Sequence, residues 1–207
     1  MKFIDFQGQF SIYPLFSLQD VRKVFNNFSY RQLDRWEKKG YLKKVKRGFY
    51  CFGTQIVDQN FLFYVANKIY TPSYVSLEMA LKHYGLIPEE IFQITSVSTK
   101  KTTSFGISIG NFSYRRIKPE LYFGYRLVYF GQQKILLAEL EKAVLDYLYI
   151  NAKLKTVADF EEMRINIDEF RAQINLEKFQ KYLEIFNNKQ LTKRANTFLT
   201  TLRNDNT

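Results

Sequence analysis

The chain has 207 residues, of which 46% are hydrophobic and 17% aromatic, and its formal net charge is +11. This apolar content excludes a wholly disordered chain, and the length suits one large domain or two small ones. The single cysteine excludes an intrachain disulfide and favours a reducing compartment. No segment is apolar over the roughly 20 residues of a membrane span, and the N-terminus does not resemble a signal peptide. We therefore expect a cytoplasmic protein with no membrane partner.

The positive charge is concentrated near the N-terminus. Residues 1–52 contain eleven basic and four acidic side chains, whereas the other 155 residues contain 20 and 16. Such asymmetry is typical of proteins that bind polyanions. A lysine-rich surface that is merely solvated has the same composition, so the interpretation depends on the elements that carry the charge.

Three short helices are predicted in this basic segment. Phe3, Phe6 and Phe10 share one face of the first. Two capping-box patterns, at residues 17–20 and 29–32, mark the starts of the second and third, because each serine oxygen can accept a free N–H of the first turn. The gap between the second and third helices has the length of a helix-turn-helix turn.

The pattern changes from helix to strand after Gly40, which we expect to end the third helix in a left-handed conformation. Residues 41–45 and 49–52 are rich in β-forming side chains, and residues 46–48 join them as a hairpin loop. Three helices and a basic hairpin predict a winged helix-turn-helix domain over residues 1–53. In this domain the third helix enters the major groove of DNA and the hairpin lies on the backbone.

Position along the third helix assigns a role to each polar side chain. With Leu33 and Trp36 facing the core, a basic stripe runs along the opposite side. A guanidinium group can pair with both O6 and N7 of guanine, and we expect the bases to be read by Arg31, Arg35, Tyr30 and Gln32. Phosphate contacts set position and affinity but not sequence, and we expect them from Ser29, Lys38, Lys39, Lys43, Lys44, Lys46 and Arg47.

Residues 54–207 are predicted to form a second, mixed α/β domain, so that the expected fold class is α+β. Strand patterns occupy about residues 91–137 and are expected to form an antiparallel sheet. Helical patterns precede this region and return over residues 138–203, with three helices in the tail and fraying at 204–207. The predicted helix N-caps are Asp58, Thr156 and Asn175.

One segment of this domain, residues 73–84, is too densely apolar for an exposed helix. We expect a buried helix there, ended by Gly85. A second basic group is predicted either to extend the DNA-binding surface or to be simply solvated; it comprises Lys100, Lys101, Arg115, Arg116 and Lys118.

No pattern of catalytic residues is found. His83 is the only histidine, so it has no partners for a zinc site or a catalytic triad. No phosphate-binding glycine loop occurs, and the adjacent carboxylates at 89–90 and 161–162 would not face each other on a helix. We therefore expect a protein that is not an enzyme and that needs no metal or other cofactor.

Three segments resemble the AbiEi family, which comprises antitoxins and transcriptional repressors of type IV toxin–antitoxin systems of the abortive-infection kind. The resemblance lies in GYLKKVKRGFYCF (residues 40–52), PSYVSLEMALKHYGLIPE (72–89) and LLAELEKAVLDYLYI (136–150). The residues that match the family pattern in the last two segments are Ser76, Ala80, Gly85, Glu141, Lys142 and Asp146. Most of these look structural; the charged ones could form either a surface group or a buried ion pair.

The resemblance implies a function and two partners. Family members bind inverted repeats of double-stranded DNA in their own promoter and repress their own operon. They also counteract a nucleotidyltransferase toxin encoded next to them, without needing a stable complex, and the second basic group could serve this neutralisation.

Two other interpretations stay open on the sequence. One is a winged-helix transcriptional regulator whose C-terminal domain senses a ligand, because an aromatic-rich sheet could form an apolar pocket. The other is an antitoxin that inhibits its toxin by direct contact, with the basic face docked on an acidic partner.

Overall fold

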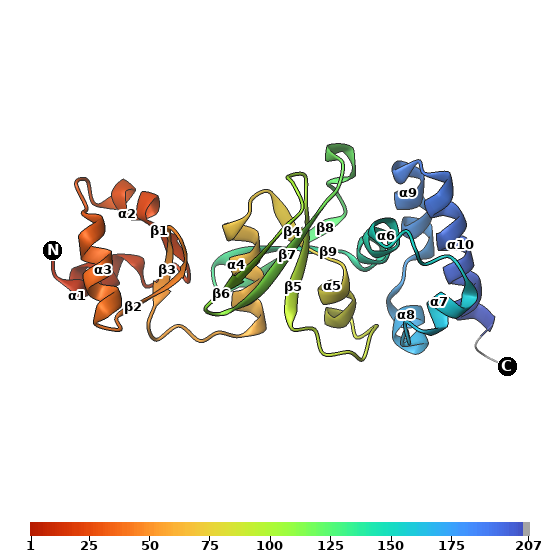
Figure 1. Ribbon diagram of the computed structural model, residues 1–207, viewed down its shortest axis with the longest axis horizontal. Helices are drawn as coiled ribbons and strands as arrows, with labels where there is room; N and C mark the ends of the chain where they lie inside the picture. Colours follow the sequence, from red (N-terminus) through yellow and green to blue (C-terminus); the bar gives the residue numbers. More distant parts are fainter. Residues whose placement is uncertain (205–207) are drawn as a thin grey trace.

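The computed structural model describes residues 1–204 and has an α+β fold, as the sequence predicts. Figure 1 shows an elongated molecule, with the N-terminal helices at one end, a twisted sheet in the middle and the C-terminal helices at the other end. The expected fraying at 204–207 concerns mostly residues 205–207, which lie outside the described residues; residue 204 still belongs to the last helix.

The N-terminal unit, residues 1–53, contains the three predicted helices and the predicted hairpin. Its elements are α1 (Phe3–Phe10), β1 (Phe16–Ser17), α2 (Leu18–Val24), α3 (Tyr30–Lys38), β2 (Leu42–Lys46) and β3 (Phe49–Phe52). The three strands form an antiparallel sheet in the order β1-β3-β2. Strand β1 was not predicted, because two residues are too few to show alternation.

One of the two predicted capping boxes is present. At the start of α2 the Ser17 hydroxyl accepts the Asp20 N–H (3.2 Å), and the Asp20 carboxylate accepts the Ser17 N–H (2.9 Å). At the start of α3 the Ser29 side chain makes no such bond, so the second capping box was wrong. The N-cap position is occupied as predicted, but the serine hydroxyl is left free to bind something else.

Glycine fixes the way α3 runs into the sheet. Gly40 adopts φ +73°, and the Tyr41 N–H donates to the Trp36 carbonyl at 3.0 Å, which is the six-to-one bond of a Schellman ending. Gly53, at the end of β3, packs against this turn: a Cβ atom there would lie 2.1 Å from the Gly40 carbonyl oxygen. The chain that leaves β3 is therefore packed against the turn that ends α3.

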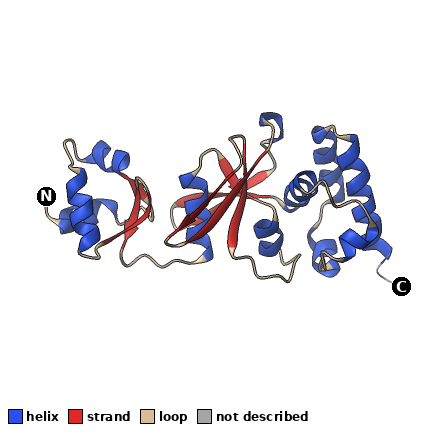
Figure 2. Ribbon diagram, viewed as in Figure 1, coloured by secondary structure: helices blue, strands red, loops and turns tan. Residues whose placement is uncertain are grey.

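A six-stranded sheet forms the middle of the molecule. Around and within it lie α4 (Gln59–Ile69), β4 (Ser73–Val75), α5 (Glu78–His83), β5 (Gln93–Ser98), β6 (Thr103–Ile107), β7 (Gly110–Arg116), the short 3-10 helix η1 (Pro119–Leu121), β8 (Tyr125–Phe130) and β9 (Gln133–Ala138). The strand order is β6-β7-β5-β4-β9-β8. Strands are therefore present where the sequence predicted them (Figure 2).

The sheet is mixed, so the prediction of an antiparallel sheet was wrong. β5 pairs with β7 in parallel, and β4 pairs with β9 in parallel, while the remaining pairs are antiparallel. The β6–β7 hairpin inserts its second strand beside β5 and leaves β6 at the edge. Turn signals in a sequence locate strands, but they do not say which strand of a hairpin pairs with the rest of the sheet.

The segment predicted as one buried helix is a strand followed by a shorter helix. Between β4 and α5, Leu77 adopts φ +62°, which interrupts helical geometry. The Thr95 hydroxyl holds this bend, because it accepts the Met79 N–H at 3.0 Å and donates to the Ser76 carbonyl at 2.7 Å. A contact with a residue almost twenty positions away thus overrides the local helical pattern. Gly85 does follow the helix with positive φ, as predicted.

The C-terminal end consists of helices. They are α6 (Leu140–Ile150), α7 (Val157–Glu161), α8 (Ile167–Gln173), α9 (Leu176–Phe186) and α10 (Lys189–Asn204). The tail beyond α6 therefore holds four helices within the described residues, where three were predicted. The predicted N-caps are all confirmed, each accepting the N–H three residues later: Asp58 at 2.7 Å, Thr156 at 3.2 Å and Asn175 at 2.9 Å.

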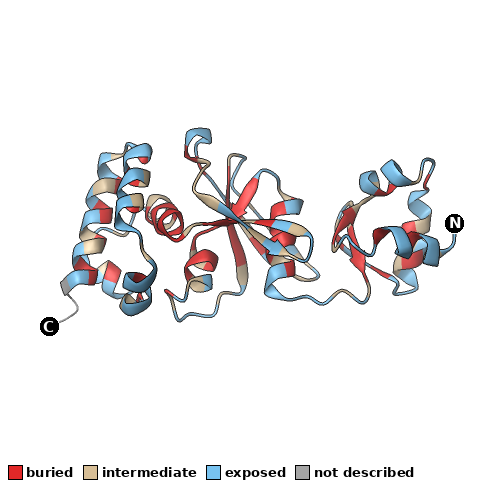
Figure 3. Cartoon of the chain, turned by 180° about the vertical axis from the view of Figure 1, so that it is seen from behind, coloured by how far each residue is buried: buried red, intermediate tan, exposed pale blue. Residues whose placement is uncertain are grey.

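The buried apolar side chains form two clusters, visible as separate buried regions in Figure 3. The smaller lies within residues 1–52 and is mostly aromatic. The larger joins the central sheet to the C-terminal helices, and three N-terminal residues, Leu15, Val45 and Cys51, pack against it. The gap between the clusters falls near the predicted domain boundary at residue 53, although the division into two domains stays a prediction.

The charged residues that match the family pattern in the third resembling segment, Glu141, Lys142 and Asp146, are buried, so they do not form a surface group. Lys142 and Asp146 form an ion pair with no exposed side-chain surface. Lys142 also donates to the Tyr74 hydroxyl (2.7 Å), and Asp146 accepts from the hydroxyls of Tyr74 (2.9 Å) and Ser76 (2.8 Å). Glu141 is buried too, and accepts the Asn175 N–H at 2.9 Å. These side chains tie α6 to β4 and to α9.

This network predicts a large stability effect. Asp146→Ala leaves the Lys142 ammonium buried without its counter-charge, which should lower the free energy of unfolding by about 3–5 kcal/mol, as measured by urea denaturation. Glu120→Ala, which breaks an exposed pair with Lys118, is the matched control and should cost less than about 1 kcal/mol. Equal effects of the two substitutions would mean that the buried pair is not needed for stability.

Candidate nucleic-acid interface

Helix α3 presents three distinct faces. Leu33 and Trp36 are buried and anchor the helix on the N-terminal core. On the opposite side Arg31, Arg35 and Lys38 are exposed and follow the spacing i, i+4, i+7, so their side chains form one stripe. The helix is thus held by its apolar face while its basic face is turned to solvent.

The two acidic residues of α3 lie between the basic stripe and the apolar face. Asp34 and Glu37 are half-buried. Burial, followed by the neighbouring Tyr30, raises the pKa of the Tyr50 hydroxyl, and the charges of Asp34 and Glu37 raise it further. Both carboxylates therefore lie close enough to β3 to act on Tyr50.

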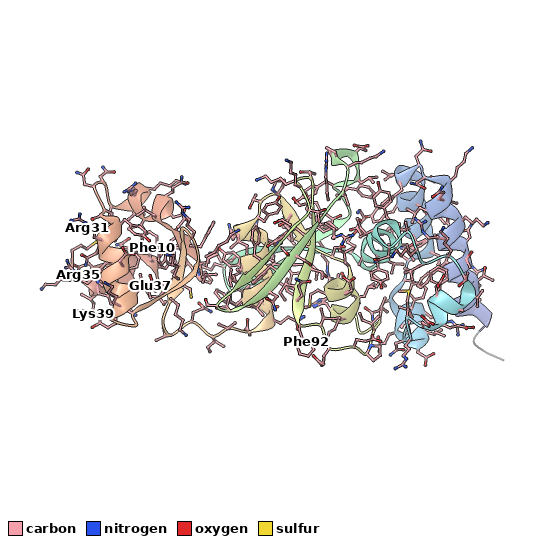
Figure 4. All side chains as sticks on the ribbon, in the orientation of Figure 1. Phe10, Arg31, Arg35, Glu37, Lys39 and Phe92 are labelled. Carbon is pink, nitrogen blue, oxygen red and sulfur yellow. The ribbon has the colours of Figure 1, made fainter. Side chains whose placement is uncertain are left out.

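Seven basic side chains of α3, the residue after it and the hairpin have no ion-pair partner among the described residues. Within residues 1–204 no carboxylate lies within 4 Å of the charged groups of Arg31, Arg35, Lys38, Lys39, Lys43, Lys44 or Arg47. Figure 4 shows Arg31, Arg35 and Lys39 projecting from the side of the unit that faces away from the central sheet. Their charges are therefore available to an anionic partner.

The other residues predicted to bind DNA at the start of α3 differ in their solvent exposure. Tyr30 is 40% exposed and Ser29 is exposed, with its hydroxyl uncommitted. Gln32 is only half-exposed. Of the four predicted base-reading residues, Tyr30, Arg31 and Arg35 are thus exposed, and Gln32 is less so.

The hairpin that follows α3 is basic on its solvent side. Lys43 and Lys44 are exposed, whereas Leu42 and Val45 are buried. β2 packs directly on α3, and Gly48 closes the turn with φ +87°. The lysines of the hairpin therefore lie next to the helix that carries the arginine stripe.

Lys46 does not lie with the other lysines. A register shift between Lys44 and Lys46 turns its side chain toward the central sheet. Its ammonium lies 3.3 Å from the centre of the Phe105 ring and donates to the Ile69 carbonyl at 3.3 Å. Burial lowers the pKa of Lys46. In this arrangement Lys46 connects the hairpin to the central sheet and is not free to contact phosphate, contrary to the sequence-based role.

The second basic group is only partly brought together. Because β5 and β7 run parallel, Lys100 and Lys101, which follow β5, lie beside Arg116 at the end of β7. The Arg116 N–H donates to the Thr102 hydroxyl of this loop at 3.1 Å. Arg115 precedes it in the strand and so points to the opposite face of the sheet, and Lys118 forms an exposed pair with Glu120 at 3.8 Å.

Two aromatic residues that the sequence analysis did not single out link the hairpin to this loop. The Tyr70 and Phe105 ring centres are 5.8 Å apart. Tyr70 donates its hydroxyl to the Lys101 carbonyl at 2.7 Å, and the Lys100 ammonium lies 5.6 Å from its ring centre. The contacts therefore run from Lys46 through two rings to Lys100. Only the general richness in aromatic residues hinted at these contacts, because the partners are 30 or more positions apart in sequence.

Other kinds of site were sought in the same structure. Among residues 1–204, no group of three or more histidine, cysteine, aspartate or glutamate side chains is placed to hold a metal ion. His83 lies 5.9 Å from the Phe63 ring centre, and burial followed by the charge of Arg126 lowers its pKa. None of the helices in the described part of the chain has the length and apolar character needed to cross a membrane.

Comparison with known proteins gives no family assignment. The chain matches no protein-family model, and no curated protein is significantly similar to it. A functional proposal therefore rests on the side chains described above and on the three resembling segments.

Proposed function

We propose that residues 1–53 are a winged helix-turn-helix domain that binds double-stranded DNA in a sequence-specific way. The observation that carries the proposal is the unpaired stripe of Arg31, Arg35 and Lys38 on α3, next to the basic hairpin. The order α1-β1-α2-α3-β2-β3, with the sheet order β1-β3-β2, supports this. In this proposal α2 and α3 are the two helices of the motif and the β2–β3 hairpin is the wing.

The dimensions and turn of the motif support the same proposal. α3 is a nine-residue α-helix, and the diameter of an α-helix with its side chains, about 10–12 Å, fits a major groove about 12 Å wide. The turn before it contains Asn27 at φ +59°, and the Arg22 guanidinium donates to the Phe28 carbonyl at 3.3 Å. This bond holds the angle between α2 and α3.

The side chains divide into two roles. Arg31 and Arg35 are one helical turn apart and are the base-reading residues, since guanidinium groups bind guanine edges in a bidentate way. Phosphate contacts come from Lys38, Lys39, Lys43, Lys44 and Arg47. Lys46 is omitted because its ammonium is already bound within the chain.

We further propose that the chain is an antitoxin that represses its own operon and counteracts a nucleotidyltransferase toxin, as the AbiEi resemblance implies. The second and third resembling segments supply Ser76, Lys142 and Asp146 to one buried network. We propose a structural role for these positions, because their polar groups are bound to one another inside the protein. We accordingly propose a repressor that is not an enzyme.

Substitution of the stripe arginines tests whether they recognise DNA bases. Arg31→Ala and Arg35→Ala should each remove about 1–3 kcal/mol of discrimination between the promoter of the chain's own operon and random DNA. The measurement is the dissociation constant for both DNAs, by fluorescence anisotropy at one fixed salt concentration. Lys189→Ala/Lys193→Ala, on α10 at the other end of the molecule, is the control and should bind like wild type. Unchanged discrimination in the arginine variants would refute the base-reading role.

Loss of the hairpin lysines tests the phosphate contacts. Lys43→Ala/Lys44→Ala should weaken specific and random DNA alike, because phosphates carry no sequence information. The slope of log K against log salt should become shallower by about 1.8, since each phosphate contact contributes about 0.9. A titration from low to moderate salt measures this slope. A change confined to the specific DNA would assign these lysines to base reading instead.

Co-expression tests the antitoxin role in the full chain. The Arg31→Ala/Arg35→Ala variant, expressed from an unrelated promoter together with the adjacent nucleotidyltransferase, should still protect growth although it no longer represses the operon. Growth arrest by the toxin in the presence of wild-type chain would reject the antitoxin proposal. Recovery of the toxin with the tagged chain in a pull-down would favour inhibition by direct contact.

A further inference from the structure

A cavity of about 390 Å³ lies between the N-terminal unit and the central sheet. Phe10, Phe16 and Phe49 form its wall on the N-terminal side, and Tyr64 of α4 forms its wall on the other side. Its size is within the range of small-molecule sites. No role in DNA binding uses this cavity, because the arginine stripe of α3 faces away from the central sheet.

We propose that this cavity binds a small aromatic anion, a planar ring system that carries one carboxylate or sulfonate group. Phe10 and Phe16 are almost fully buried, and their ring centres are 5.4 Å apart in an edge-to-face arrangement. These two rings form the tightly packed floor of the cavity, and the apolar surface that a planar guest can cover comes from more exposed lining residues. Tyr13 and Val24 extend the apolar surface outward at the mouth, where they are 39% and 51% exposed.

The charges at the mouth favour an anion. Two cations, Lys23 and Lys68, border the cavity together with one carboxylate, Asp20. Asp20 is already occupied: it accepts the Ser17 N–H and hydroxyl and lies 3.8 Å from the Lys23 ammonium. Lys68 has no carboxylate within 4 Å in the described part of the chain, and its ammonium lies 5.3 Å from the Tyr64 ring centre. It is therefore positioned to meet the charge of a guest that stacks near Tyr64.

The side chains of Tyr64 and Gln133 both carry hydrogen-bond donors in the cavity. The Tyr64 hydroxyl donates to the Gln133 side-chain oxygen at 3.1 Å, and burial, aided by Asp20 and Tyr13, raises the pKa of Tyr64 to about 12. The amide nitrogen of Gln133 makes only a long bond of 3.5 Å to the Ile12 carbonyl. One of its two hydrogens remains free for an acceptor on the guest. An anionic group is thus matched by one cation and one amide donor.

The site spans two parts of the chain, since α2 and α4 both contribute to it. A bound guest would therefore stabilise the contact between the N-terminal unit and the central sheet, which Lys46 also maintains. This inference is independent of the proposed function, because the cavity needs neither DNA nor a toxin.

The test is binding of naphthalene-2-sulfonate to the full chain by isothermal titration calorimetry without DNA, compared with the neutral naphthalene-2-sulfonamide. We expect saturable binding at one site per chain, with the sulfonate bound more tightly. Lys68→Met should lower the affinity for the sulfonate by about twofold to fivefold, the range for exposed charge pairs. It should leave the affinity for the sulfonamide unchanged. Lys189→Met, on the outer face of α10, is the matched control and should change neither of the two affinities.

A second variant tests the location. Val24→Trp fills the mouth from a half-exposed position and should reduce binding of both compounds more than tenfold, with circular dichroism as the check of folding. No saturable binding by the wild-type chain, equal affinity for the two compounds, or wild-type affinity of folded Val24→Trp would overturn the proposal. If Val24→Trp does not fold, the Lys68→Met comparison still decides, since an unchanged sulfonate affinity would overturn it. None of these results affects the DNA titrations.

Discussion

The packing of Trp36 against the aromatic core of the N-terminal unit fixes the orientation of everything that the unit presents to solvent. The Trp36 ring lies 4.8 Å from Phe6, 5.2 Å from Phe3 and 5.8 Å from Phe28, centre to centre. Together with Leu33 it sets the rotation of α3 about its axis. Once that rotation is set, the helical spacing places Arg31 and Arg35 outward. The basic stripe is thus a consequence of apolar packing on the other side of the helix.

A second constraint joins the N-terminal unit to the central sheet. Lys46 lies against Phe105, and the Ser108 hydroxyl donates to the Lys44 carbonyl at 3.2 Å. A cation over an aromatic ring with part of its water removed contributes roughly 0.5–2 kcal/mol, enough to favour one arrangement of the units without making it rigid. The same junction contains the aromatic cavity beside Tyr64. A guest bound in this cavity, as proposed, would therefore act on the same contact between the N-terminal unit and the central sheet.

The buried pair of Lys142 and Asp146 connects the C-terminal helices to the central sheet. It lies between α6 and β4, far along the chain from the basic N-terminus, and every charged atom in it is paired or hydrogen-bonded. Burying two charges brings little net stability over apolar side chains, yet either partner alone would be strongly unfavourable. The pair therefore couples the position of the C-terminal helices to that of the sheet, and it explains why the resemblance includes charged residues inside a helix that is otherwise apolar.

The sequence by itself determined the elements whose signals are local: the helices of the basic segment, the hairpin closed by Gly48, the strands between residues 91 and 137, and the stripe of Arg31 and Arg35. Helix caps and apolar periodicity act within a few residues, so they can be read without knowing the fold. Tertiary structure alone decided the parallel pairing of β5 with β7, the bend at Leu77 held by Thr95, and the burial of Lys142. It also turned Lys46 inward, because a register shift in β2 brought its side chain to Phe105. Each of these depends on partners that are distant in the sequence, and no local pattern specifies which distant residue will be the neighbour.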